Sequence, residues 1–245
     1  MKAQIIAFAN HKGGVGKTSS VANISAILAS KAKKVLMIDL DAQANLSLLF
    51  LDEIPGRTIY NAMVDRKDIP VYNIRENLDI VPSTLEMIYI EQKINPRRVE
   101  YILSDLVKNL RDRYDYIIID CPPALGLTTI NALTIANKLF VPMLADKMSC
   151  YGVDMIKDFC CEMQDLNPGL HIDGIFINQY LKSNLAKSVE EQMRADYGDI
   201  VFKTIVRNNT AVKEAGVMKT DIVSYAPDSN GAVDYTALAN EMFDL

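Results

Sequence analysis

Residues 10–19 constrain the fold more than any other part of this sequence. They read N-H-K-G-G-V-G-K-T-S and follow directly on the apolar run at residues 5–9. Glycine adopts backbone conformations that strain other residues, so Gly13, Gly14 and Gly16 allow a tight turn whose N–H groups point inward. An apolar strand, a glycine-rich turn and a G-K-T ending before a helix are typical of a nucleotide-binding P-loop.

The polar groups of this turn have predicted roles toward a polyphosphate. The residues expected to bind the nucleotide here are Lys12, Gly13, Gly14, Val15, Gly16, Lys17, Thr18 and Ser19. Lys17 is expected to reach the β- and γ-phosphates, and the Thr18 hydroxyl to bind Mg²⁺. The helix that follows adds the positive end of its dipole. Lys12 is a second cation, which an ordinary P-loop does not need, and it indicates a specialised subclass.

Strand and helix patterns alternate along the rest of the chain. Short buried strands are predicted at residues 4–10, 34–40, 78–82, 116–121, 138–143 and 172–178. Helices are predicted at residues 98–111, 127–136, 150–165, 185–197 and 233–243. This alternation predicts an α/β fold: a doubly wound, mainly parallel sheet with helices on both faces and the active site at the carboxyl ends of the strands. We expect a single P-loop ATPase domain over residues 1–245.

Composition limits the class of protein. The net charge of −5 argues against a surface built throughout for nucleic acid, so any DNA contact has to be a local patch. The four cysteines form no C-x-x-C pair, which favours buried or incidental thiols over a metal site. The apolar strand begins almost at Met1, and no run approaches the ~18 apolar residues of a spanning helix. We therefore expect a cytoplasmic protein without a signal peptide or a membrane segment.

Two carboxylates follow the second predicted strand in the sequence D-L-D-A-Q-A-N, residues 39–45. Their position at a strand end lets both face a nucleotide-bound Mg²⁺ and its water. Asp41 is predicted to orient or polarise the attacking water, and Asp39 to bind Mg²⁺ through its outer shell. The alternative interpretation is a helix amino terminus with acidic caps. The division of labour between the two carboxylates stays open at this point.

A third motif, Y-I-I-I-D-C-P-P at residues 116–123, is an apolar strand that ends in a carboxylate. This is the Walker B pattern, which predicts that Asp120 lies beside the P-loop and holds a water on Mg²⁺. An apolar strand ending in Asp is also common for purely structural reasons. The two prolines end the strand, so residues 124–129 are predicted to form a loop that senses the γ-phosphate.

Together the motifs K-G-G-V-G-K-T, D-L-D-A-Q-A-N and I-I-I-D-C-P-P resemble those of the ParA/Soj family of partition ATPases. The resemblance covers nearly the whole chain, because the tail I-V-S-Y-A-P-D-S-N-G-A-V-D-Y-T-A-L-A-N-E is also similar to that family. The chain starts at the first strand and so resembles the small type, which lacks an N-terminal helix-turn-helix domain.

The resemblance implies a mechanism. ATP would be sandwiched between two subunits, and Lys12 would reach across to the partner's phosphates and neutralise charge in the transition state. The resemblance further implies a homodimer that depends on ATP, non-specific DNA binding by that dimer and slow hydrolysis stimulated by a ParB-type partner. The cargo would be a plasmid or a chromosomal origin, and the protein would be associated with the nucleoid.

Contacts to the base and to DNA are less sharply marked. Asn178, at the end of a predicted strand, is expected to exchange hydrogen bonds with adenine, and Pro227 and Asp228 to supply an apolar edge and a backbone contact. The alternative is that Asn178 caps a turn. The DNA candidates are Lys182, Lys187, Arg207, Lys213 and Lys219. Many members of the family carry an arginine where this chain has Asn230, which is a departure from the DNA-binding pattern.

The main alternative is a membrane-surface ATPase similar to MinD, which shares the variant P-loop. Such a protein would end in a basic amphipathic helix, whereas this chain ends in N-E-M-F-D-L, which is acidic. A reductase similar to the nitrogenase iron protein would need cysteines placed to bridge a cluster, and Cys121 followed by two prolines does not fit.

Overall fold

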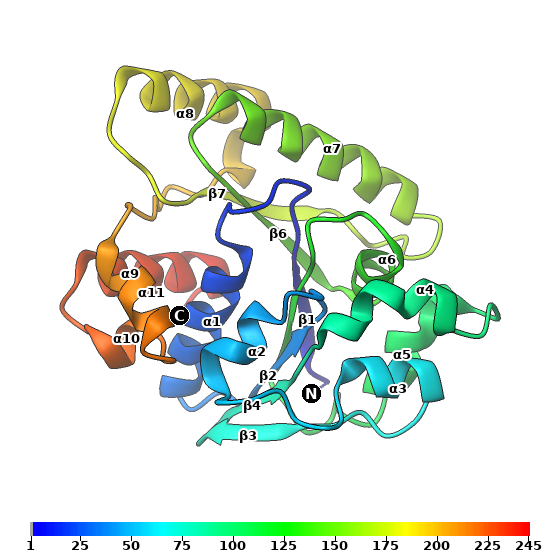
Figure 1. Ribbon diagram of the computed structural model, residues 1–245. Helices are drawn as coiled ribbons and strands as arrows, with labels where there is room; N and C mark the ends of the chain where they lie inside the picture. The colour runs from blue at the N-terminus through cyan, green and yellow to red at the C-terminus, as the bar shows by residue number, and fades with distance from the viewer. Residues whose placement is uncertain (1) are drawn as a thin grey trace.

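Seven strands form one sheet in the order β3-β4-β2-β5-β1-β6-β7 in the computed structural model, which describes residues 2–245 (Figure 1). The strands are β1 Gln4–Phe8, β2 Val35–Asp39, β3 Tyr72–Arg75, β4 Leu78–Val81, β5 Tyr116–Asp120, β6 Lys138–Met143 and β7 Ile172–Ile177. All neighbouring pairs are parallel except β3 and β4, which are antiparallel. The predicted α/β fold with a mainly parallel sheet is confirmed.

Helices connect the strands and cover both faces of the sheet (Figure 1). The α-helices are α1 Lys17–Ser30, α2 Asn45–Phe50, α3 Ile59–Asp65, α4 Ile90–Lys93, α5 Ile102–Val107, α6 Leu127–Ile135, α7 Lys147–Met163, α8 Asn184–Tyr197, α9 Thr210–Val217, α10 Ile222–Tyr225 and α11 Asn230–Phe243. Short 3₁₀ helices lie at η1 Leu85–Tyr89, η2 Val99–Tyr101 and η3 Gly198–Ile200. In the part of the chain described, no helix combines the length and the apolar character needed to cross a membrane.

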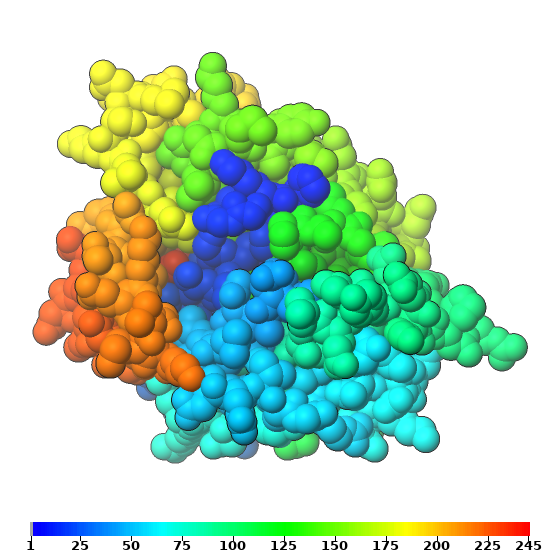
Figure 2. Space-filling view, viewed as in Figure 1, coloured from blue at the N-terminus to red at the C-terminus, as the bar shows by residue number. Residues whose placement is uncertain are grey.

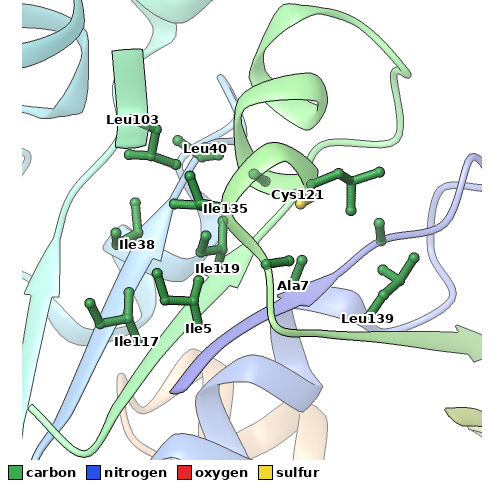
Figure 3. Packing of buried hydrophobic residues seen from close by; sticks show 14 of the residues in the cluster. Ile5, Ala7, Ile38, Leu40, Leu103, Ile117, Ile119, Cys121, Ile135 and Leu139 are labelled. Atoms are coloured by element: carbon green, nitrogen blue, oxygen red, sulfur yellow. The ribbon is translucent and has the colours of Figure 1, made fainter. Parts of the chain in front are cut away.

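The two faces of the sheet bury separate apolar clusters, because successive side chains of a strand point to opposite faces. In β1, Ile5 and Ala7 belong to the cluster under α3, α5, α6 and α7, whereas Ile6 and Phe8 belong to the cluster under α1 and α11. Figure 3 shows the first cluster, where Ile117 and Ile119 of β5 lie between residues of the neighbouring strands. The near-continuous apolar runs of the sequence are explained by this burial on both sides.

The strand order brings three carboxyl ends together at one edge of the sheet. β5 lies between β1 and β2, and Asp120 is the register partner of both Phe8 in β1 and Asp39 in β2. The loop after β1 therefore begins next to the two carboxylates that end β2 and β5. This arrangement places the candidate site at the carboxyl edge of the sheet, as predicted.

Several elements differ from those predicted. β3 was not predicted, because its sequence Y-N-I-R is short and half exposed, as is common for an edge strand. The helix predicted at residues 98–111 is broken: a 3₁₀ turn leads into α5, which ends at Val107. α7 begins at Lys147, three residues before the predicted start, because the Asp146 carboxylate caps it by accepting from Ser149 N.

Candidate active site

The loop between β1 and α1 needs glycine for two different physical reasons. Gly14 and Gly16 have positive φ angles of 74° and 88°, where L side chains are strained. At Gly16 a Cβ atom would also lie 2.2 Å from Nδ2 of Asn178. Nothing lies within 4 Å of the corresponding positions at Gly13 and Gly14, so their outer sides face open space. In Figure 2 the blue atoms of this loop are exposed near the centre of the molecular face.

Gly16→Ala is expected to lower the free energy of unfolding by about 1–3 kcal/mol, because it combines a strained φ with the contact to Asn178. For a chain of this size that corresponds to a fall in Tm of roughly 5 °C. Gly13→Ala is the matched control, since it adds the same methyl group to the same loop without a neighbour within 4 Å. Thermal unfolding of both variants without nucleotide measures the difference, and equal Tm values would contradict the steric account.

Lys17 lies inside this loop. Lys17 is 7% exposed, and its Nζ donates to the backbone carbonyls of Asn10 at 3.0 Å and Lys12 at 3.2 Å. Burial lowers the pKa of the Lys17 ammonium, and the negative charge of Asp120 opposes that shift. The loop is thus closed around a cation whose partners in this structure are only carbonyl oxygens. A phosphate would offer that cation a stronger, charged acceptor.

Asp39 is completely buried and holds the loop that follows β2. One carboxylate oxygen accepts from Ser47 N at 2.9 Å and Ser47 Oγ at 2.7 Å, and the other accepts from Asp41 N at 3.1 Å. Burial raises the pKa of Asp39 to about 6, against the lowering effect of the Ser47 hydrogen bonds. Ser47 Oγ in turn accepts from Ser83 N after β4. Asp39 therefore fixes the backbone position of Asp41, and its outer-shell magnesium role stays a prediction.

Asp41 itself is half-buried, and one of its carboxylate oxygens accepts from Gln43 N at 2.9 Å. It borders a recess of about 340 Å³ that also includes Pro122, Pro123 and Leu127. The loop predicted at residues 124–129 ends earlier, because α6 begins at Leu127. The loop at residues 121–126, here called the switch loop, forms the other wall. Asp41 and the switch loop thus face each other across one open recess, which is accessible to water.

Asp120 ends β5 as a buried carboxylate with an unusual environment. It is 1% exposed, and neither carboxylate oxygen has a hydrogen-bond partner in the part of the chain described. Burial first, and then the neighbouring charge of Asp39, raises the pKa of Asp120 well above its usual value, while the nearby Thr18 hydroxyl and the Lys17 charge oppose the rise. Buried polar atoms are almost always satisfied, so this orphaned pair calls for a missing partner. A hydrated magnesium ion supplies both the positive charge and the hydrogen-bond donors, and the site therefore fits that ion.

Lys12 does not join Lys17 in the interior of the loop. Its Nζ donates to both carboxylate oxygens of Asp146 at 2.8 Å and to Ser149 Oγ at 3.1 Å. Partial burial raises the pKa of the Asp146 carboxyl, but the hydrogen bonds from Lys12 and Ser149 outweigh that effect and hold the pKa below its usual value. Gly152 completes this contact, because a Cβ there would lie 2.8 Å from Asn10 Oδ1. The amino-terminal half of α7 is therefore fitted closely to the start of the glycine-rich loop.

Asn178 holds the glycine-rich loop by a hydrogen bond to its backbone. It is 1% exposed; its Nδ2 donates to Val15 O at 3.1 Å and its Oδ1 accepts from Gln179 N at 2.8 Å. Asn178 also lines a recess of about 90 Å³ that Ser19, Asn208 and Tyr235 border. Pro227 and Asp228 are not among its lining residues; they lie exposed in the turn between α10 and α11. The structure thus brings only Asn178 of the three predicted base contacts to this recess.

The predicted DNA contacts differ in their surroundings. Arg207 forms a two-pronged ion pair with Asp234, with distances of 2.8 and 2.7 Å. Lys219 pairs with Asp52 at 3.0 Å, and Lys187 with Glu191 at 3.6 Å. For Lys182 and Lys213 the structure of residues 2–245 records no ion pair, and both are exposed. Three of the five cations are therefore paired with carboxylates of the same chain, and the pairs of Lys187 and Lys219 are exposed ones that contribute about 0–1 kcal/mol.

Sequence reasoning missed the residues that hold the site from a distance. Asp146, Ser149 and Gly152 contact the loop across more than 130 residues of chain. Gln179 was also missed, and its Nε2 donates to Gly14 O at 2.9 Å. The only signal available was local: Asp146 followed three residues later by Ser149 is typical of a helix cap. That signal predicts a helix start and gives no indication of contact with Lys12.

Comparison with known proteins places this site in a family. Residues 3–172 match the family model described as "AAA domain". The sporulation initiation inhibitor protein Soj of Bacillus subtilis is 35% identical over 248 residues, covering 98% of each chain. The chromosome-partitioning ATPase Soj of Treponema pallidum is 34% identical, covering 97% of this chain and 96% of that protein.

Solved structures agree in fold. A plasmid partition protein of Borrelia burgdorferi bound to AMPPNP is 28% identical with a TM-score of 0.83, covering 99% of this chain and 98% of the other. The septum site-determining protein MinD of Pyrococcus horikoshii with Mg-ADP is 25% identical with a TM-score of 0.80, covering 98% and 96%. The glycine-rich loop, the carboxylates of β2 and β5 and these full-length similarities lead to one conclusion: this chain belongs to the ParA/Soj family of P-loop ATPases.

Proposed function

We propose that this protein is an ATP-dependent dimerising switch that hydrolyses ATP to ADP and phosphate and thereby partitions or positions DNA. The observation that carries the proposal is that the chain has two lysines at one loop, of which only Lys17 occupies its interior, while Lys12 is held outside by Asp146. A second cation placed at the rim is suited to a phosphate that another subunit presents. The names of the relatives, chromosome-partitioning ATPase and plasmid partition protein, support the DNA cargo.

ATP and Mg²⁺ are the proposed cofactors. Solved relatives support both, because one binds Mg-ADP and another binds AMPPNP. Lys17 and the backbone N–H groups of Gly13, Gly14, Val15 and Gly16 would bind the phosphates, and Thr18, Asp120 and Asp39 would hold the ion directly or through water. The ion supplies positive charge to the phosphate oxygens when bound. Asp41, with one oxygen not used by Gln43, would orient the attacking water across the recess beside the switch loop.

Adenine binding is proposed for the recess beside Ser19, which adjoins the start of α1. Asn178 would act there chiefly by holding the loop, because its amide already donates to Val15 O. Pro227 and Asp228 remain proposed contacts to the base. Their exposed turn lies directly before α11, whose buried Tyr235 also borders the recess.

The dimer would form when Lys12 exchanges Asp146 for a phosphate bound to the other subunit. The cost of leaving Asp146 is small: the two side chains are 28% and 38% exposed, and such ion pairs contribute about 0–1 kcal/mol. A phosphate in a site closed by a second subunit is a stronger partner, since water is excluded. Dimerisation would therefore require the γ-phosphate, and its loss would release Lys12 to Asp146 again.

DNA would bind non-specifically to the ATP dimer, and a ParB-type partner would stimulate hydrolysis. The proposed contacts are the C-terminal cations Lys182, Lys187, Arg207, Lys213 and Lys219, of which Arg207 also resembles a basic loop of the family. The second candidate function, a MinD-like ATPase on a membrane surface, is favoured by the similarity to MinD.

The proposal is tested by measuring mass in solution together with phosphate release. Light scattering is expected to show a dimer with ATP and a monomer with ADP, with slow hydrolysis of ATP. DNA binding is expected only with ATP and should weaken steeply with salt. A protein that stays monomeric with ATP would refute the switch, and ATP-dependent sedimentation with anionic vesicles rather than DNA would favour the MinD-like function.

Asp41→Ala is expected to slow hydrolysis by roughly 10²–10³-fold, the range typical for loss of a group that positions or deprotonates the nucleophile. ATP binding and the ATP dimer should persist, because Asp41 contacts neither Lys17 nor Lys12 in this structure. Asp52→Ala, which removes an exposed carboxylate from the same region of the chain, is the control. Phosphate release from the two variants is compared, and unchanged turnover in Asp41→Ala would move the role elsewhere.

A further inference from the structure

The turn at residues 93–98, between α4 and η2, carries a cluster of exposed cations. Lys93, Arg97 and Arg98 are all exposed, and within residues 2–245 none of them forms an ion pair with a carboxylate. Glu91 and Glu100 flank the turn, but residues 93–98 themselves contain no acid. The turn projects from the body at the right of Figure 1, and the same projection is visible in Figure 2. In a chain of net charge −5, it is a local positive surface.

The turn is held in one shape by contacts of its own. Arg66, after α3, donates from its guanidinium to the carbonyl oxygens of Asn95, at 2.8 Å, and Arg97. Arg98 has a positive φ of 49°, and its guanidinium lies over the Tyr101 ring with 5.1 Å to the centroid. A cationic turn fixed before binding loses less conformational entropy when it meets an anionic partner.

The turn is also connected to the nucleotide site through one short helix. Glu91 in α4 accepts from Leu127 N at 3.3 Å, where α6 begins at the end of the switch loop. The switch loop starts directly after Asp120, and Met87, Ile90 and Glu91 line the recess that it shares with Asp41. These contacts connect the switch loop to α4 and, two residues later, to the turn.

We propose that this turn binds the phosphate backbone of DNA and that the switch loop sets its position through Glu91; the inference rests on the proposed function. Three of the five C-terminal candidates are paired with carboxylates, whereas the cations of this turn have no ion-pair partner within residues 2–245. Guanidinium groups bind phosphate through two parallel hydrogen bonds, which favours Arg97 and Arg98 as the contacts.

The test is DNA binding of the full chain in the ATP state, measured by fluorescence anisotropy over a range of salt concentrations. Arg97→Ala/Arg98→Ala is expected to weaken binding by roughly tenfold or more and to reduce the slope of log K against log salt by about two. Arg97→Lys/Arg98→Lys should keep most of that slope. Lys33→Ala/Lys34→Ala, a pair of lysines before β2 at the opposite edge of the sheet, should bind like the parent protein. ATP hydrolysis and Tm are expected to stay unchanged in these variants, which would exclude misfolding as the cause of weaker DNA binding.

The outcomes separate the inference from the proposed function. If the parent protein binds DNA with ATP and Arg97→Ala/Arg98→Ala binds equally well, the inference is overturned and the switch stands. If only Lys182→Ala/Lys213→Ala loses affinity, the contact lies in the C-terminal third and the inference is again overturned. If the parent protein fails to bind DNA with ATP even at low salt, DNA binding by the dimer fails, and the inference with it. Loss of binding to a polyglutamate probe with unchanged DNA binding would assign the turn to an acidic protein partner instead.

Discussion

Lys12→Ala is expected to bind ATP with nearly unchanged affinity and to lose hydrolysis by about 10³-fold or more. The first result follows because Lys12 Nζ contacts Asp146 and Ser149 rather than the interior of its own loop, where Lys17 lies. The second follows from the proposed role across the dimer, since a cation inserted by a partner at a transferring phosphoryl group contributes about 10³–10⁵ in rate. Fluorescent ATP binding, light scattering and phosphate release measure the three properties separately.

Lys147→Ala is the matched control for this variant. It removes an exposed lysine from the residue next to Asp146 and leaves the glycine-rich loop intact. The control should dimerise and hydrolyse ATP like the parent protein. If Lys12→Ala forms ATP-dependent dimers of normal stability, or turns over ATP within tenfold of the parent protein, Lys12 does not act on the phosphate of the partner subunit. Its role would then be structural, through the contact with α7.

Lys17→Ala is expected to reduce ATP affinity by at least 100-fold. The buried ammonium would otherwise form charge-assisted hydrogen bonds to two phosphates, each contributing about 1.5–3 kcal/mol. The variant also removes the donor that serves the Asn10 and Lys12 carbonyls, so part of the effect could come from a loosened loop. Calorimetric titration with ATP and thermal unfolding without nucleotide distinguish the two causes.

Lys31→Ala serves as the control for Lys17→Ala, because it removes an exposed lysine at the other end of α1. It should bind ATP normally. Submicromolar binding of ATP by a correctly folded Lys17→Ala protein would contradict the assignment of the loop to phosphates. A reduced Tm together with restored binding at low temperature would show that the lysine acts mainly on the fold.

The fold and the core of the site could be predicted because their causes are local. Buried parallel strands appear as unbroken apolar runs, and the two glycines that permit a positive φ, Gly14 and Gly16, stand only two residues apart in the chain. Once β1, β2 and β5 are recognised as parallel, their carboxyl ends must share an edge. The proximity of Asp39 and Asp120 to the glycine-rich loop follows from topology without any knowledge of side-chain contacts.

The contacts that control the site could not be predicted, because their causes lie far apart in sequence. Asp146 could be recognised as a helix cap, but its choice of Lys12 as a partner depends on how α7 crosses the loop. Arg207 was predicted to contact DNA from its charge and its resemblance to a basic loop of the family, whereas its two-pronged pair with Asp234 depends on the position of α11. Edge strand β3 and the short helices α2, α3 and α9 carry too few buried residues for a clear period.

The buried carboxylate of Asp120 sets the stability of the fold against the proposed binding of magnesium. Burying this acid, whose oxygens accept no hydrogen bond by geometric criteria within residues 2–245, costs stability, and an apolar side chain of similar volume would remove that cost. Selection for heat resistance alone would therefore tend to replace Asp120 and discard the group that fits magnesium. The native chain therefore accepts a lower stability in its most buried layer and keeps a carboxylate next to the glycine-rich loop.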